Sequence, residues 1–392
     1  MKSRILIFSV AYEPLVGGAE IAVRNITDRL LDYEFDLITC RLDHELTTQE
    51  KIGNVNVYRV GFGTRLGRYL YPVFAFRLAS KLHKQNPYHI VWAIMAAYAS
   101  AAALLFLRRN PQVKFLLTLQ EGDPISHIHR RVRAFRRSWQ QIFKRADYVQ
   151  AISNYLADWA RAEGAVCPVE VVPNGVALEN FQFPISNFQK NLKIIITTSR
   201  LVRKNGLDIL IKAITVIASE AKQSLEHGIA SSPDLGRDPR NDRNIKLVII
   251  GSGPEERNLK TLAKKLQVND VVEFLGDVSP NEIPKYLLQA DIFVRASRSE
   301  GLGISFLEAM AAGVPVIATP VGGIPDFLKD RETGLFSKPE DPKDLSEKIK
   351  ELLEDEELRK KLAYNARSLV EQDYDWNKIA LRYESIIHHL IP

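Results

Sequence analysis

Two glutamates enclose a glycine-containing segment around residue 300. Glu300 is followed directly by Gly301-Leu302-Gly303, and seven residues separate it from Glu308. Glycines that open a helix let the backbone approach a ligand closely, and the exposed N–H groups there favour an anion. Carboxylates bind hydroxyl groups by accepting their hydrogen bonds. An anion site between hydroxyl acceptors predicts that this segment binds a sugar nucleotide.

A second segment combines two cations with a glycine that opens a helix. Arg200 and Lys204 follow a strand predicted at residues 192–199, and Gly206 precedes the next predicted helix. A guanidinium can bind two phosphate oxygens at once, and an ammonium adds a compact positive charge. This segment therefore suits a diphosphate.

Glycines and polar side chains also follow the strands predicted at 4–10, 114–119 and 246–250. Folds with parallel sheets bind ligands at the carboxyl ends of their strands. The candidate substrate-binding residues at these ends are Gly17, Gly18 and Glu20, then Gln120, Glu121 and Asp123, then Gly251 and Gly253. The last pair lacks the third glycine of a dinucleotide fingerprint. A turn with a helix cap explains Asp123-Pro124 about as well as a binding role does.

The elements that must position these residues follow from the pattern of apolar residues. Strand and helix signals alternate along the chain, which predicts parallel sheets covered by helices. Residues 290–296 predict a buried strand, and residues 304–312 predict a helix with apolar side chains three and four positions apart. Further strands are predicted at 36–39, 55–60, 89–94, 148–151 and 272–276.

The string from Glu300 to Glu308, followed by Gly313-Val314-Pro315-Val316 and Gly322-Gly323, resembles the donor-site signature of a known family. That family is the retaining glycosyltransferases of family 4, or group 1. The resemblance implies the GT-B fold, an α/β fold of two Rossmann-like domains whose parallel sheets face an interdomain cleft. It implies transfer of a hexosyl unit, with retention, from a nucleotide-diphosphate sugar to a glycan or lipid-linked acceptor. Neither a metal nor a cofactor is implied.

The resemblance also assigns roles to single residues. Glu300, Arg200 and Lys204 are the implied catalytic residues: Glu300 holds hydroxyls of the sugar, and the two cations hold the diphosphate together with the amides of Gly301–Gly303. Glu308 is implied to hold the ribose.

This chain departs from the family pattern in two places. Family members usually have a lysine directly before the glycine that opens the helix, where this chain has Asn205 with Lys204 one position earlier. Relatives often carry a histidine near the position of Gln120, thought to contact the transferred sugar. The acceptor-side chemistry therefore stays open at this point.

The predicted domain boundary lies at an Asn-Gly turn, Asn174-Gly175, which resembles the family's linker. We expect an acceptor-side domain at 1–174, completed by a terminal helix at 375–392, and a nucleotide-sugar-binding domain at 175–374. The segment 220–244 lacks apolar periodicity and is rich in Gly, Pro, Ser, Asp and Arg, which predicts a disordered insertion.

Composition limits the location of the protein. Among its 392 residues, two cysteines are too few for a disulfide framework, and no apolar run has the length of a membrane span. The first strand starts without a signal-peptide pattern. We expect a cytoplasmic protein, and the resemblance suggests a role in cell envelope polysaccharide biosynthesis.

The basic residues are concentrated in the first half of the chain. Residues 1–180 hold 23 Lys and Arg against 16 Asp and Glu, net +7, and the remainder is net −1. Seven of these cations lie in a helix predicted at 127–145, among Val132, Phe135, Trp139 and Phe143. Such a helix can bind an anionic membrane surface, here the inner face of the plasma membrane. It can equally be a solvated face over an ordinary core; no nucleic-acid partner is expected.

Two alternatives to a transferase remain at this point. A sugar-nucleotide epimerase or a phosphorylase would use a similar two-domain fold. A non-catalytic protein that binds anionic surfaces would use only the basic helix, and the combination of Glu300, Glu308 and Arg200 argues against it.

Overall fold

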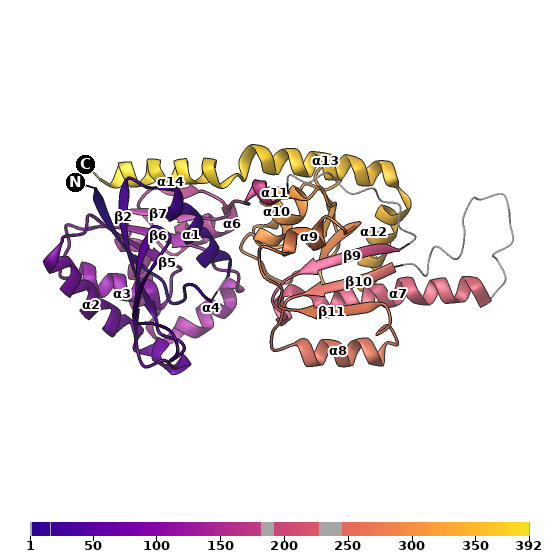
Figure 1. Ribbon diagram of the computed structural model, residues 1–392, viewed down its shortest axis with the longest axis horizontal. Helices are drawn as coiled ribbons and strands as arrows, with labels where there is room; N and C mark the ends of the chain where they lie inside the picture. Colours follow the sequence, from indigo (N-terminus) through magenta and orange to yellow (C-terminus); the bar gives the residue numbers. More distant parts are fainter. Residues whose placement is uncertain (1, 16, 182–191, 227–244, 392) are drawn as a thin grey trace. The chain divides into compact units, whose positions relative to one another are not determined.

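The computed structural model describes residues 2–15, 17–181, 192–226 and 245–391 (Figure 1). The chain divides into two compact units: one extends to Gly175 and takes up the segment from Trp376 onward, and the other runs from Val176 to Asp375. Both units are α/β, with sheets of parallel strands apart from one antiparallel edge strand. The predicted fold class is confirmed in this respect.

The first unit contains an eight-stranded sheet in the order β3-β4-β2-β1-β5-β6-β7-β8. Its strands are β1 Ser3–Phe8, β2 Tyr33–Cys40, β3 Gln49–Ile52, β4 Val55–Val60, β5 Ile90–Ile94, β6 Lys114–Leu119, β7 Tyr148–Ala151 and β8 Val169–Val171. The strands that bury most of their residues, such as β1 and β5, are those that apolar runs predict. The sequence patterns miss β3, because this edge strand is polar and largely exposed.

Seven α-helices belong to the first unit within the described residues. They are α1 Gly18–Arg29, α2 Tyr71–Gln85, α3 Tyr98–Leu107, α4 Ile125–Val132, α5 Arg136–Arg145, α6 Asn154–Ala162 and α14 Trp376–Leu390, with 3-10 turns η1 at Arg65–Tyr69 and η2 at Arg133–Phe135. The terminal helix α14 packs into this unit, where the Tyr383 hydroxyl donates to Gln150 Oε1 at 2.6 Å and its ring lies 5.4 Å from that of Trp92.

The single helix predicted at 127–145 is wrong. The structure has two helices joined by η2, because the backbone leaves helical angles at Val132 (φ −96°, ψ 1°) and again at Phe135 (φ −132°, ψ 27°). Val132 turns inward and is buried, while Phe135 is exposed. The cations are therefore distributed over two helices and a turn.

The second unit contains a six-stranded parallel sheet in the order β11-β10-β9-β12-β13-β14. Its strands are β9 Lys193–Thr198, β10 Ile245–Ile250, β11 Val272–Gly276, β12 Ile292–Arg295, β13 Val316–Ala318 and β14 Leu335–Phe336. Its helices are α7 Leu207–Glu226, α8 Glu256–Lys265, α9 Ile283–Leu287, α10 Ile304–Ala311, α11 Ile324–Phe327, α12 Pro342–Glu354 and α13 Glu356–Asp373, with 3-10 turns at Leu178–Phe181 (η3) and Arg203–Asn205 (η4).

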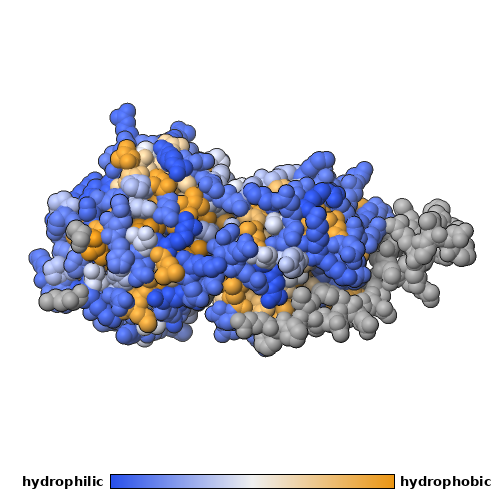
Figure 2. All heavy atoms as spheres, turned by 90° about the horizontal axis from the view of Figure 1, so that it is seen from above, coloured by the Kyte–Doolittle hydropathy of each residue, from blue (hydrophilic) through white to orange (hydrophobic). Residues whose placement is uncertain are grey.

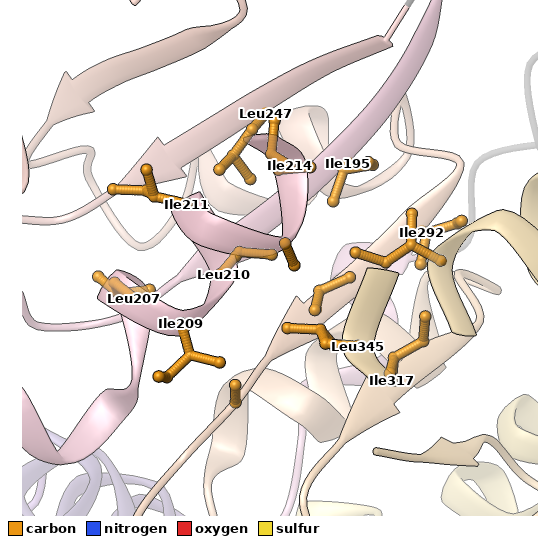
Figure 3. Packing of buried hydrophobic residues seen from close by; sticks show 14 of the residues in the cluster. Ile195, Leu207, Ile209, Leu210, Ile211, Ile214, Leu247, Ile292, Ile317 and Leu345 are labelled. Carbon is orange, nitrogen blue, oxygen red and sulfur yellow. The ribbon is translucent and has the colours of Figure 1, made fainter. Parts of the chain in front are cut away.

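One apolar cluster fills the space between this sheet and the helices on one of its faces. Figure 3 shows Ile195, Leu247, Ile292 and Ile317 of the strands pointing toward side chains of α7 and toward Leu345 of α12. Nearly all of these side chains are fully buried. Burial of this kind fixes the strands, and so fixes the loops at their carboxyl ends.

The predicted insertion at 220–244 is wrong in its first part. Residues 220–226 continue α7, because they are helix formers without glycine or proline. Residues 227–244 lie outside the described part of the chain.

The surface is largely hydrophilic on the face that Figure 2 shows, with hydrophobic residues in small separate groups. No helix in the described ranges is long and apolar enough to cross a membrane.

Candidate functional site

The two glutamates lie on a loop and helix at the carboxyl end of β12. The loop ends at Gly303, which adopts a left-handed conformation (φ 92°, ψ 84°) immediately before α10. A Cβ atom at this position would lie 2.7 Å from Arg295 Nη2 and 2.6 Å from the Phe306 ring. Gly303 is therefore required both by the backbone angle and by the close approach of its neighbours.

The Glu300 carboxylate is held from two sides. Its Oε2 accepts a hydrogen bond from Arg295 Nη2 at 2.6 Å, and its Oε1 accepts one from the Gly301 N–H at 3.1 Å. The Glu300 carbonyl oxygen accepts from the Gly323 N–H at 3.2 Å. A Cβ on Gly322 would lie only 1.8 Å from that oxygen, so the glycine pair of the sequence signature packs directly beneath Glu300.

Arg295 is a residue that the motifs do not single out. It is 4% exposed, and its Nη1 donates to Ser305 Oγ at 2.7 Å and to the Thr198 carbonyl at 3.3 Å. Its guanidinium carbon lies 4.2 Å from the centre of the Phe306 ring. The available signal was a charged residue at the end of an otherwise apolar strand, Ile292–Arg295.

Glu308 lies on α10 and is half-buried. Burial raises the pKa of this carboxyl to about 7, and the positive charge of Arg295 opposes that rise. The same burial lowers the pKa of Arg295, while Glu300 and Glu308 act in the opposite direction. The buried Arg295 guanidinium therefore interacts electrostatically with two carboxyl groups, those of Glu300 and Glu308.

The cation segment lies in the loop between β9 and α7, with Arg200 exposed and Lys204 half-buried. Gly206 is left-handed (φ 68°), and a Cβ there would lie 1.7 Å from the Ala296 carbonyl oxygen. The Arg298 N–H donates to the Lys204 carbonyl at 2.6 Å. These contacts join the cation loop to the loop that carries Glu300.

Two side chains stabilise the cation loop further. Asn205, where the family usually has lysine, is buried, and its amide donates to the Arg200 carbonyl at 2.7 Å. Arg298 donates to both carboxylate oxygens of Asp208, at 2.7 and 2.9 Å, and also to Glu340. The Asn205 side chain therefore stabilises the conformation of the loop. Lys204 is the residue of this loop that can supply the positive charge of the family's lysine.

Gly251 and Gly253 follow β10 and approach the cation loop from its other side. A Cβ on Gly251 would lie 2.1 Å from the Ser199 carbonyl oxygen, and one on Gly253 would lie 2.5 Å from the Leu201 carbonyl oxygen. The Leu201 N–H donates to the Ser252 carbonyl at 2.8 Å. The structure therefore brings the loops after β9, β10 and β12 together at one edge of the sheet, where parallel sheets bind ligands.

The remaining candidates belong to the first unit, at the carboxyl ends of β1 and β6. Helix α1 begins at Gly18, after Gly17 in an extended conformation (φ −142°). A Cβ on Gly17 would lie 2.7 Å from Glu20 Oε2. Gln120 is buried and accepts a hydrogen bond from the Asn174 side chain at 3.1 Å, while Asp123 lies just before α4.

The two carboxyl oxygens of Glu121 differ in their partners. Its Oε1 accepts a hydrogen bond from the Ala96 N–H at 2.6 Å, whereas its Oε2 is buried without a hydrogen-bond partner among the described residues. Burial raises the pKa of Glu121 to about 7, although hydrogen bonding to backbone groups opposes the rise, and the charge of Asp123 adds a smaller rise. Nine other buried side-chain atoms of the described residues also have no partner, so this feature makes Glu121 a candidate and does not by itself assign a binding role.

Some cations of the basic segment pair with a buried carboxylate, even where they are exposed. Glu163 is buried and lies 2.6 Å from His129 Nε2 and 3.1 Å from Arg136 Nη2, and it also accepts from Gln140 at 3.0 Å. Arg136 therefore has a structural role. We define the basic surface as the exposed residues Arg130, Arg131, Arg133, Phe135 and Arg137.

Family models match both halves of the chain. The model described as Glycosyl transferases group 1 matches residues 179–369, and the model described as Glycosyltransferase Family 4 matches residues 16–180. These ranges contain every candidate residue named above.

Relatives and a solved structure agree with the family models. The uncharacterized glycosyltransferase MJ1178 of Methanocaldococcus jannaschii is 26% identical over 387 residues, which cover 99% of this chain and 98% of that protein. The GDP-mannose-dependent monoacylated alpha-(1-6)-phosphatidylinositol monomannoside mannosyltransferase of Corynebacterium glutamicum is 32% identical over 271 residues, covering 64% and 65%. The structure of sucrose-phosphate synthase from Thermosynechococcus elongatus superposes with a TM-score of 0.80 at 20% identity, covering 99% of both chains. This chain therefore belongs to the group 1 glycosyltransferases of family 4, and it has their GT-B fold.

Proposed function

We propose that this glycosyltransferase transfers a hexosyl unit from a nucleoside-diphosphate sugar to a glycan or lipid-linked acceptor, with retention at the anomeric carbon and without a metal. The observation that carries the proposal is the packing of the cation loop against the loop of Glu300, through the Arg298–Lys204 hydrogen bond and the close contact of Gly206 with Ala296. A sugar diphosphate needs cations and a hydroxyl acceptor near each other, and the contact between the two loops supports this role for Arg200, Lys204 and Glu300.

The diphosphate end of the donor is bound by positive charge. Arg200 and Lys204 supply two cations, and the backbone N–H groups of Leu302 and Gly303 lie at the start of α10, where the helix dipole favours an anion. When the sugar leaves, negative charge develops on the diphosphate. Cations and N–H groups that are already in place stabilise that charge without reorganisation. Such electrostatic stabilisation makes the largest contribution to the rate enhancement of many enzymes.

The sugar and the ribose are bound by carboxyl groups. Glu300 accepts hydrogen bonds from hydroxyls of the transferred sugar, because its two oxygens have more lone pairs than its two present partners use. Glu308, one to two turns into α10, accepts from the ribose. The position of each carboxyl on the loop or on the helix supports this division of roles.

The acceptor side belongs to residues of the first unit. Glu121 offers an unpartnered oxygen to an acceptor hydroxyl. Gly17 and Asp123 lie on loops that follow strands of that sheet, and Gly18 and Glu20 lie in the first turn of α1. Gln120 acts through its hydrogen bond with Asn174, which holds the strand end.

The acceptor's lipid character and the link to the cell envelope rest on two supports. The corynebacterial relative is named for a phosphatidylinositol mannoside acceptor. The basic surface combines four arginines with an exposed Phe135, which suits an anionic leaflet on the cytoplasmic side.

A thermal-shift screen against nucleotide sugars tests the donor assignment. A nucleotide sugar that binds the folded protein raises its melting temperature by mass action. We expect a rise with at least one nucleoside-diphosphate hexose in the presence of EDTA, and no such rise with Arg200→Gln/Lys204→Gln. No rise with any nucleotide sugar would contradict the proposal, and a rise that EDTA abolishes would contradict metal independence.

A further inference from the structure

Arg295 lies outside the sequence signature but forms an ion pair with Glu300, a residue of that signature. Its side chain is buried at the end of β12, between the strand and the first turn of α10. The Arg295–Glu300 pair has an Nη2–Oε2 distance of 2.6 Å, and the exposed fractions of the two side chains are 5% and 14%. The cation is therefore shielded from solvent together with its partner.

A buried arginine is an expensive choice for stability. Taking a charge out of water costs several kcal/mol per ion even after relaxation, and a buried ion pair often contributes no more than apolar residues of the same volume would. Arg295 Nε also lacks a hydrogen-bond partner among the described residues. An apolar side chain would continue the pattern of β12, so stability alone gives no reason for an arginine here.

The geometry ties Arg295 to the proposed reaction. Its guanidinium donates to Glu300 and to Ser305, and its Nη2 approaches the Cα of Gly303 so closely that a Cβ there would lie 2.7 Å away. The charged groups that face it are Glu300 on the loop and Glu308 on α10. Asp208 and Glu340 instead pair with Arg298.

We propose that Arg295 is a positioning residue for sugar transfer, which fixes the orientation of the Glu300 carboxylate and balances its charge. This inference rests on the proposed function of Glu300. One Glu300 oxygen is turned toward Arg295 and the other toward the Gly301 N–H, so the remaining lone pairs are directed by these two contacts. A carboxylate held in this way needs no rearrangement when the sugar binds.

Steady-state kinetics of Arg295→Met and Arg295→Lys test the inference. We expect kcat to fall about a hundredfold in Arg295→Met with KM for the donor changed much less, since misplacement of a catalytic group by about 1 Å costs that much. Arg295→Lys keeps the charge and should be intermediate in kcat.

Arg4→Met is the matched control. Arg4 lies at the amino end of β1 and makes an ion pair of the same length, 2.6 Å, to the buried Asp36. Its replacement should lower stability and leave kcat and KM for the donor unchanged. If Arg295→Met shows only that pattern, Arg295 is structural and the inference is overturned. If Arg295→Met does not fold, Arg295→Lys decides, and a wild-type kcat in that variant overturns the inference.

A double-mutant cycle with Glu300→Gln distinguishes a failure of the inference about Arg295 from a failure of the proposed function. If Arg295 acts through Glu300, Arg295→Met should lower kcat only a few-fold further in the Glu300→Gln background. Full additivity would contradict the inference while leaving the proposed function intact. A wild-type protein that turns over no nucleotide sugar would contradict the proposed function, and the inference with it.

Discussion

At the level of single residues, the account depends most on Glu300. Glu300→Gln keeps the shape of the side chain and can still accept from Arg295, but it weakens the hydrogen bonds to sugar hydroxyls. Hydrogen bonds to a charged group contribute about 1.5–3 kcal/mol, so kcat should fall about tenfold to a hundredfold. Because these contacts matter most in the transition state, donor affinity should change little. Isothermal titration and initial rates check this, and an unchanged kcat would remove Glu300 from the reaction.

Glu308 gives the protein a pH dependence whose direction follows from burial. Its pKa is raised from 4.5 to about 7. The folded state therefore keeps a proton that the unfolded state loses, and the stability from this group falls as pH rises from about 4.5 to about 7.

Glu308→Gln has no proton to lose, so its free energy of unfolding should fall less over this range, by about 1–3 kcal/mol. Denaturation of both proteins at pH 4.5 and at pH 7, without nucleotide, measures the difference. The same pH dependence in both proteins would contradict a Glu308 that keeps its proton in the folded state.

Sequence patterns predicted where some of the candidate residues lie. The structure has Glu300 and its glycines on the loop after β12, and Glu308 on the helix that follows, as the sequence predicted. Their binding roles stay a proposal. Arg295 was not predictable, because its role depends on the fold placing the end of β12 beside the first turn of α10. The buried amide of Asn205 was likewise unpredictable, since its hydrogen bond to the Arg200 carbonyl exists only in the folded loop.

At the level of elements, buried strands were the most predictable parts. β4, β6 and β7 begin and end where the apolar patterns place them. The polar edge strand β3 gave no such signal, and the interruption of the basic segment at η2 could not be read from amphipathic periodicity. The last turns of α7 were mistaken for an insertion because polar composition hid good helix formers.

Helix α7 leads to a prediction about the segment that follows it. Deletion of residues 227–244, with a short Gly-Ser linker from Glu226 to Ile245, should leave the melting temperature and activity nearly unchanged, because this sequence has few large apolar residues and loop length has a small entropic effect. Deletion of 220–244 also removes two turns of α7 and the Glu220–Lys350 ion pair, and should lower the melting temperature. Scanning calorimetry compares the two, and loss of soluble protein in the shorter deletion would contradict the prediction.

The basic surface leads to a prediction about membranes. The protein should bind vesicles rich in anionic lipid, because each cation of the basic surface near the leaflet contributes about 1 kcal/mol. Added salt should weaken this binding. Replacing three of its four arginines, Arg130, Arg133 and Arg137, by Gln should release the protein into the supernatant. Arg136 is kept, because its pairing with Glu163 makes it part of the fold.

The matched control replaces Arg257, Lys264 and Lys265 of α8, which are also exposed, and changes the net charge equally. In vesicle sedimentation, the α8 variant should pellet with the vesicles as wild type does, and the variant of the basic surface should stay in the supernatant. If wild-type protein stays in the supernatant at low salt, the basic surface is a solvated face.

At the level of the whole molecule, the sequence predicted two α/β domains because alternating strands and helices leave few other architectures. The product of the reaction depends on the acceptor, and no sequence motif identifies that acceptor. We propose Glu121 for acceptor recognition because its Oε2 is buried without a hydrogen-bond partner among the described residues.

Release of nucleoside diphosphate from a nucleotide sugar tests the central claim most directly. The donor found by thermal shift is incubated with wild type or Glu300→Gln, with and without an extract of glycans and glycolipids as acceptors. The account predicts release that depends on the extract, produces a glycosylated acceptor and is strongly reduced in Glu300→Gln. Formation of an epimeric nucleotide sugar, release of sugar 1-phosphate, or no turnover of any donor would contradict it.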